Sequence, residues 1–383
     1  MSSEPDTFKR SKKLYSSAGH SYHDPMVRFI SFLIAIVAMT GIVPAKEHFF
    51  RALAEKSADA AEVLVIYSTV DIEIARPLLA AFQKRERQMA IRYHDIQTLE
   101  LYDRVVRETR THNATADFLL SSAMDLQMKL ANDGFAAGWS DPEIDQIPRW
   151  ARWRNEAFGI TFEPAVIIYN KAYFPPGSVP HTRADLMSVL EKRDPSLFGR
   201  VATYDAARSG LGFLFLARDA EHHKDVWRFY RLLGENGAKL YSRSQAIIDR
   251  VASGRFVLGY NLLGSYAAAH AARDDRLGVV VPTDFTVVMS RIAIIPKAAR
   301  NPQLGARFLS FILSRDGQEI VAGPMHMNAV TMRLSGPSTA RALRAKLGAA
   351  LRPIRVGPGL LVYLDQAKRQ RLLKRWNAAL SGN

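Results

Sequence analysis

Short apolar runs alternate with amphipathic segments along most of the chain. The runs at 63–67 (VLVIY), 89–93 and 117–120 are rich in Val, Ile, Leu and Tyr, as buried strands are. Between them, segments such as 74–84 and 99–110 repeat apolar residues at helical spacing. Strands that alternate with helices in this way predict βαβ units around largely parallel sheets, and therefore an α/β fold.

The pattern breaks between residues 135 and 163, where three of the five tryptophans fall, and then resumes. Its later part predicts strands at 165–170, 200–204 and 256–260, helical stretches at 183–192, 213–233 and 245–252, an apolar run at 278–296 and a mostly helical end from 303. We expect two α/β lobes with mainly parallel central sheets, between which the chain crosses near 160–168 and 282–294. Lobe 1 would hold residues 46–163 and about 285–330, and lobe 2 would hold 164–284 and about 331–383.

An uncharged stretch of fifteen residues, 29–43, follows Arg28 and precedes Pro44. It is shorter than the roughly 20 residues that a membrane-spanning helix needs, and it matches the apolar part of a secretory signal. We expect residues 1–45 to form a signal region, with Met26 as an alternative start and a mature protein that begins near Lys46. Such a protein would be exported to the periplasm. An uncleaved anchor or a buried helix is the alternative.

The amino-acid composition excludes several kinds of functional site. The chain has 383 residues, no cysteine and a net charge of +15, because 52 Lys and Arg face 37 Asp and Glu. The absence of cysteine excludes disulfides, thiolate zinc sites, iron–sulfur clusters and a cysteine nucleophile. No nucleotide-binding, zinc-protease or serine-hydrolase motif is present, so we expect no catalytic residue, no metal and no cofactor. The basic residues are spread along the chain without long runs, which disfavours nucleic acid as a partner.

Hydroxyl-bearing turns follow four of the predicted strands. The residues concerned are Ser68 and Thr69, Ser121 and Ser122, Arg208 with Ser209 and Gly210, and Tyr260 with Asn261. Ser68 with Asp71, and Ser122 with Asp125, fit the S-x-x-D pattern of a helix cap. Open α/β sheets bind ligands at the carboxyl ends of their strands, and helix amino termini attract anions. A single turn of this kind is usually only a cap, but four turns in two lobes indicate a ligand site.

The order and spacing of these segments resemble the periplasmic solute-binding proteins of ABC importers. The similarity is to the type II, two-lobed branch that includes ferric-iron, thiamine and phosphosugar binders, and it runs from about residue 62 to 330. It rests on segments such as VLVIYST (63–69), ADFLLSSAMDLQMKLANDG (116–134), FGITFEPAVIIYNK (158–171) and GRVATYDAARSGLGFLF (199–215). The resemblance implies two hinged lobes that close around one solute, with the four turns as contacts and with Glu163 and Pro164 at the hinge.

The resemblance also implies partners, namely a small-molecule solute and an ABC permease with its ATPase. A membrane sensor kinase is the alternative partner, and we expect the protein to be a monomer. Ferric-iron binders of this branch use adjacent tyrosines, and this chain has no Tyr-Tyr pair. Tyr260, Trp227 and Asp205 leave a thiamine site open. Hydroxyls, helix amino termini and Arg208 are better suited to a phosphate ester or a carboxylate.

Overall fold

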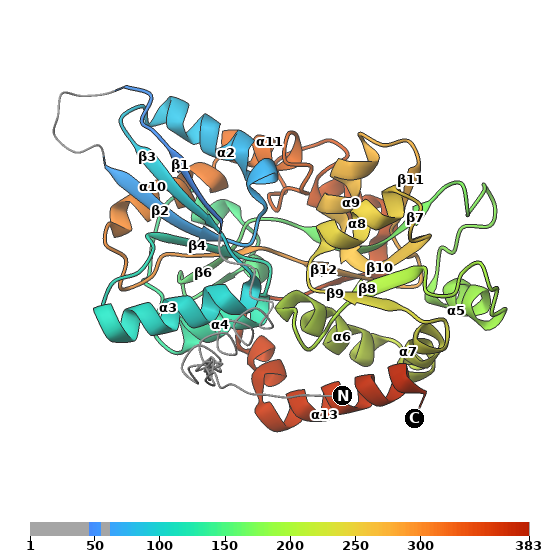
Figure 1. The fold of residues 1–383 in the computed structure, drawn as a ribbon. Coiled ribbons are helices and arrows are strands. Elements are labelled where there is room, and N and C mark those ends of the chain that lie inside the picture. The colour runs from blue at the N-terminus through green and yellow to red at the C-terminus, as the bar shows by residue number, and fades with distance from the viewer. Residues whose placement is uncertain (1–45, 55–61, 383) are drawn as a thin grey trace, which may run out of the picture. The chain divides into compact units, whose positions relative to one another are not determined.

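The computed structural model describes residues 46–54 and 62–382, which belong to one compact unit. The predicted signal segment lies outside the described residues. Two sheets, each flanked by helices, form the α/β architecture that the sequence predicts (Figure 1). The sheets are mixed and not mainly parallel as expected, because antiparallel pairings outnumber parallel ones. We call each sheet with its helices a lobe. Among the described helices, none is long and apolar enough to cross a membrane.

The first lobe is built on a sheet of seven strands. Their spatial order is β1 (Lys46–Phe50), β3 (Ala90–Asp95), β2 (Val63–Ser68), β4 (Phe118–Ser121), β13 (Ile292–Ile294), β6 (Ala157–Gly159) and β5 (Arg152–Trp153). Its helices are α2 (Ile72–Arg85), α3 (Thr98–His112), α4 (Met124–Asn132), α10 (Pro302–Leu313) and α11 (Arg315–Ala322). The βαβ strands β3, β2 and β4 pair in parallel, whereas β13 enters antiparallel.

The second lobe is also built on seven strands. Their order is β14 (Leu351–Pro353), β12 (Thr286–Met289), β7 (Glu163–Asn170), β10 (Leu258–Leu263), β8 (Val201–Tyr204) and β9 (Lys239–Tyr241), and β11 (Leu277–Val280) also pairs with β7. Its helices are α5 (Arg183–Glu191), α6 (Gly210–His222), α7 (Val226–Glu235), α8 (Ser244–Ala252) and α9 (Gly264–Ala271). Near the end of the chain follow α12 (Ala340–Leu347), the 3-10 segment η4 (Pro358–Leu364) and α13 (Gln366–Ser381).

The structure corrects one local prediction in the second half of the chain. The helical stretch 213–233 is two helices, α6 and α7, separated by the polar residues 223–225 (HKD). The return to the first sheet comes between β12 and β13, at residues 290–291.

The S-x-x-D patterns do not form the predicted helix caps. Helices α2 and α4 begin at Ile72 and Met124, so their cap positions fall on Asp71 and Ala123, and neither makes a side-chain cap. Ser68 Oγ instead accepts from Val70 N at 3.1 Å. Ser68 therefore holds the turn that leads into α2, and Ser121, which accepts from Ala123 N, holds the turn that leads into α4.

The two passages between the sheets are joined by a buried ion pair. Glu163 begins β7 directly after the first passage, and Arg291 lies on the second. Both side chains are buried, and Arg291 Nε lies 2.9 Å from Glu163 Oε1. Thr161 Oγ1 donates to the same oxygen at 2.8 Å, and Pro164 faces Val288 in the register of β7 and β12. The predicted hinge residues thus lie where the chain passes between the lobes.

Candidate ligand-binding site

Residues of both lobes line a small cavity between the two sheets. Its volume is about 50 Å³, roughly that of one or two waters. Its polar lining is Thr69, Asp71, Gln97, Thr98 and Ser122 from the first lobe, and Tyr204, Ser209, Ser242, Arg243, Ser244 and Tyr266 from the second. A larger cavity of about 650 Å³ shares Asp71 and Arg243 with it, and is also lined by both lobes. We call the two together the interlobe cleft.

Helix amino termini from both lobes converge on the small cavity. Helices α2, α3, α6, α8 and α9 each begin next to a residue that lines it, and the cap residues concerned are Asp71, Gln97, Ser209, Arg243 and Leu263. The first turn of a helix has backbone N–H groups without intrahelical acceptors, and the helix dipole makes this end positive. These helix ends therefore bring partial positive charge to a space that is lined by hydroxyl groups, Asp71 and Arg243.

Three polar contacts join the lobes around the cavity. Gly210 N donates to Thr98 Oγ1 at 3.2 Å, and Asp71 N donates to Tyr266 OH at 3.1 Å. Arg243 Nη2 lies 2.6 Å from Asp95 Oδ1. Because each contact has one partner in each lobe, all three depend on the lobes being together. The structure therefore describes a closed arrangement.

Arg243 is the cationic side chain of the small cavity. It also lies 3.5 Å from Asp71 Oδ1, so it is shared between two carboxylates. Burial raises the pKa of Asp95, and the nearby Arg243 guanidinium opposes that rise. A guanidinium has five N–H donors, so Arg243 has the donor capacity to bind a further oxyanion in the cavity.

The two cavity tyrosines are neutral hydrogen-bonding groups. Tyr204 OH bonds to Ser244 Oγ, and burial raises the pKa of Tyr204 to about 12. Burial and the nearby Asp71 carboxylate also raise the pKa of Tyr266. Both phenols are therefore protonated near neutral pH, which opposes their use as phenolate ligands. Among the described residues, no group of three or more His, Asp or Glu side chains is arranged to hold a metal ion.

The structure brings part of the predicted site together. Thr69, Ser122 and Ser209 line the small cavity, and Gly210 lies at the contact between the lobes. Ser68 and Ser121 are buried one residue away, where their hydroxyls accept from Val70 N and Ala123 N. Arg208 is exposed and does not line either cavity of the cleft.

Tyr260 and Asn261 lie in the interior of the second lobe, away from the cavity. Tyr260 OH donates to Asp219 Oδ2 at 2.9 Å and accepts from Arg183 Nε at 2.8 Å. Asn261 Nδ2 donates to the same Asp219 oxygen at 2.7 Å. Asp219 and Arg183 are both buried, so these side chains satisfy a buried ion pair. The sequence pattern predicts that the strand ends at these residues and that they contact the ligand, but β10 continues to Leu263 and both side chains are buried within the lobe.

Sequence reasoning missed the turn Ser242-Arg243-Ser244. This turn follows β9 and leads into α8. It therefore has the same strand–turn–helix arrangement by which the other turns were predicted as ligand contacts. The strand has only three residues, Lys239–Tyr241, and two of them are exposed, so it lacks the apolar run of a buried strand. A search for hydroxyls and arginine before amphipathic helices would have found it.

Two α/β lobes that close over a polar cavity define a two-lobed binding protein. The family model described as bacterial extracellular solute-binding protein matches residues 78–335, and the chain belongs to this family. A search of curated proteins gave no match.

Solved structures agree with this assignment. The substrate-binding protein of an ABC transporter from Agrobacterium tumefaciens is 49% identical, with a TM-score of 0.85, over 88% of this chain and 99% of that one. Two more distant structures show the fold alone. AfuA from Actinobacillus pleuropneumoniae, with fructose-6-phosphate bound, is 19% identical at a TM-score of 0.69, over 84% and 99% of the two chains. The apo ferric ion-binding protein A from Pasteurella haemolytica is 18% identical at 0.60, over 84% and 96%. This protein is thus an extracellular solute-binding protein of an ABC transporter, with a small-molecule ligand and a permease as partner.

Proposed function

We propose that this protein binds a small anionic solute, a phosphate ester or a carboxylate, in the interlobe cleft and delivers it to its permease. The observation that carries the proposal is the convergence of helix amino termini from both lobes on one cavity that contains hydroxyls and Arg243. Oriented N–H groups and a guanidinium are the donors that oxyanions prefer. Export through the segment at 29–43 would place the protein outside the cytoplasmic membrane.

Closure follows from the contacts that join the lobes. In an open state Thr69 and Ser122 would be exposed on one lobe, with Ser209 and Arg243 on the other. A solute bound to one lobe adds contacts to the other only when the lobes meet, so it shifts the equilibrium towards the closed form. The hinge pair of Glu163 and Arg291 lies at the two passages, and Arg291 Nη1 approaches the carbonyl of Thr69 at 3.5 Å. The hinge is therefore linked directly to a turn that binds the solute.

The cavity residues favour an anion over the alternatives. Ferric iron would require phenolate or carboxylate ligands, and the raised pKa values of Tyr204 and Tyr266 oppose the first. A cation such as thiamine would need a carboxylate, and Asp71 and Asp95 of the small cavity region already face Arg243, which leaves Glu73 and Asp249 in the larger cavity. An oxyanion could instead use the remaining N–H donors of Arg243 together with the helix amino termini.

The larger cavity provides space for the remainder of the solute. Its volume of about 650 Å³ falls within the range of small-molecule sites. It begins at Arg243 and Asp71, beside the anion-binding end of the cleft. A solute with one anionic group and a polar body, such as a phosphorylated sugar, would fit this arrangement.

A thermal-shift screen would test the proposal. The exported protein is mixed with phosphorylated sugars, phosphoglycerates, simple carboxylates, thiamine and ferric iron. A ligand at 100 times its dissociation constant stabilises the fold by about 2.7 kcal/mol. We expect a shift with a phosphate ester or a carboxylate. A shift with thiamine or iron alone would contradict the ligand class while leaving the solute-binding function in place.

A further inference from the structure

The basic surplus of this chain is concentrated near its carboxyl end, contrary to the even distribution that we expected. Residues 331–383 contain eleven Lys and Arg against one acidic residue, Asp365. This segment alone therefore supplies ten of the fifteen net positive charges of the chain. All but its first five residues lie beyond the part that the family model matches, 78–335.

These cations are not neutralised within the fold. Among the described residues, none of the eleven lies within 4.0 Å of a carboxylate, although eighteen such pairs occur elsewhere. Asp365 itself caps α13 by accepting from Lys368 N at 2.8 Å. A group of unpaired charges on one segment produces a strong local field, because neighbouring acidic side chains do not cancel it.

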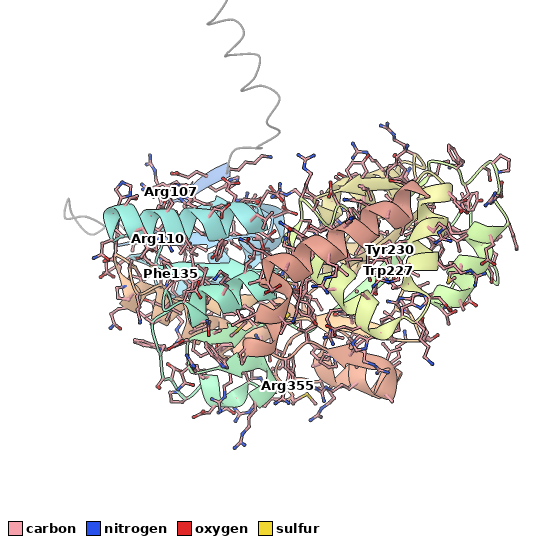
Figure 2. The ribbon with its side chains drawn as sticks, turned by 90° about the horizontal axis from the view of Figure 1, so that it is seen from below. Arg107, Arg110, Phe135, Trp227, Tyr230 and Arg355 are labelled. Carbon is pink, nitrogen blue, oxygen red and sulfur yellow. The ribbon has the colours of Figure 1, made fainter. Side chains whose placement is uncertain are left out.

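Helix α13 carries five of these eleven cations. Helix α13 packs its buried Trp376 and Ala379 into the second lobe, beside Trp227 and Tyr230 of α7. Lys368, Arg371, Lys374 and Arg375 are exposed on its outer side. In Figure 1, α13 lies along the lower edge, below α6 and α7. Figure 2 looks onto this side, with α13 in front, Arg107 and Arg110 of α3 on the left and Arg355 near the lower edge.

An apolar side chain of the same carboxyl-terminal segment is also exposed. Val362 of η4, which leads into α13, is 48% exposed. We call the four exposed cations of α13, with Arg355 and Val362, the basic face. Clustered Lys and Arg on one side of an amphipathic helix are typical of segments that bind anionic lipid.

We propose that the basic face binds the protein to an anionic phospholipid surface. The partner permease is a membrane protein, so the chain works next to a bilayer. The larger cavity of the cleft is lined by α2, α8 and α9, on the upper side of Figure 1, whereas α13 lies on the lower side. Attachment through the basic face would therefore leave this cavity uncovered, and it would raise the local concentration of the protein near its permease.

Vesicle flotation tests this proposal. The protein is used in the form that cells export, with its amino terminus determined by mass spectrometry. It is mixed with vesicles of phosphatidylglycerol and phosphatidylethanolamine, or of phosphatidylcholine alone. We expect binding to the anionic vesicles that falls steeply as salt rises, since a Debye length of about 10 Å at 0.1 M screens exposed charges. Equal binding to both kinds of vesicle would overturn the proposal.

A matched pair of variants separates the basic face from the total charge. The first variant replaces Lys368, Arg371, Lys374 and Arg375 with Gln, and the control replaces Lys84, Arg85, Arg87 and Arg255, which are also exposed. We expect the first variant to bind anionic vesicles roughly 100-fold more weakly and the control to bind nearly as the wild type does. An equal loss in both variants would overturn the proposal, and so would wild-type binding to a DNA duplex but not to vesicles.

Folding of the first variant is checked in the same experiment. Arg375 lies 4.3 Å from the ring of Trp227, so its replacement removes a cation–π contact. A triple variant that keeps Arg375 therefore accompanies it, and both are tested for their thermal-shift response to the solute. Weak vesicle binding together with an unchanged solute response would support the proposal. Unchanged vesicle binding by the folded triple variant would contradict it.

Discussion

Two clusters of polar residues, one at the small cavity and one in the interior of the second lobe, differ in where their hydrogen-bond partners lie. Around the small cavity, Thr98, Tyr266 and Arg243 make contacts from one lobe to the other. In the interior of the second lobe, Arg183 and Asp219 form a network whose partners all belong to that lobe. The first cluster depends on closure and can exchange partners with a solute. The second is complete without any ligand.

The comparison shows why residue type does not separate binding from stability. Tyr260 of β10 and Ser209, which follows β8, are both polar residues of the second lobe, yet the first supports a buried ion pair and the second lines the cleft. A polar group that is fully bonded within its own lobe stabilises that lobe. A polar group whose partner lies in the other lobe contributes to closure. Substitutions in the two clusters should therefore differ in what they change.

The largest expected effect is on stability, in the second cluster. Arg183→Met would leave the buried Asp219 carboxylate without its cation, and breaking a buried pair in this way costs about 3 to 5 kcal/mol. Urea denaturation measures the loss. The control Arg193→Met breaks an exposed pair with Glu235 and should cost no more than about 1 kcal/mol. If both variants lost the same free energy of unfolding, the buried network would stabilise the protein no more than an exposed ion pair does.

The next effect is on affinity, in the cavity cluster. Arg243→Gln would remove the cation of the small cavity, and a hydrogen bond to a charged group contributes about 1.5 to 3 kcal/mol. We expect solute affinity to fall by roughly 10- to 100-fold. Calorimetry with the best compound from the screen measures the change, with Arg255→Gln in the same lobe as the control. Unchanged affinity would remove Arg243 from the site.

Asp125 extends the comparison to a buried carboxylate that has, among the described residues, neither an ion pair nor a network of hydrogen-bond donors. It accepts from Leu126 N at 2.9 Å, and burial raises its pKa to about 6 from an ordinary value of about 3.9. The folded state therefore holds this proton more tightly than the unfolded chain does. Stability contributed by the protonated form is present below about pH 4 and is lost as pH rises through about 6.

The corresponding variant is Asp125→Asn. We expect it to equal the wild type in stability near pH 4 and to exceed it by about 2 to 3 kcal/mol above pH 7, since each pKa unit corresponds to about 1.4 kcal/mol. Urea denaturation across this pH range measures the difference. Asp103→Asn, at an exposed position on α3, is the control. A difference that does not change with pH would contradict the role of burial.

The smallest expected effect is at Arg208. Because this side chain is exposed and lines neither cavity of the cleft, Arg208→Ala should change solute affinity by less than about twofold. Its stability should change by no more than about 0.5 kcal/mol, as for most surface substitutions. The same calorimetry and urea experiments measure both quantities. A large loss of affinity would mean that Arg208 reaches the solute in a conformation different from this one.

Much of the fold could be predicted from the sequence because buried strands and helices have recognisable patterns of apolar residues. The strands at 63–67 and 165–170 appear as β2 and β7, and the helices at 74–84 and 183–192 appear as α2 and α5. The strand β9 could not be found in this way, since its residues are partly exposed. The polar run EHHKD at 221–225 marks the break between α6 and α7, but the prediction included it in a single helix.

The sequence by itself determined the α/β class, the two-lobed family and the turns from which a site would be built. These features depend on residue order over short spans, which apolar periodicity and turn residues record directly. Only the tertiary structure decided which turns face the other lobe, because a side chain at a strand end can point to either side of the sheet. It alone paired Glu163 with Arg291 and Arg243 with Asp95. Each pair joins residues more than a hundred positions apart, and their approach follows from packing of the whole chain.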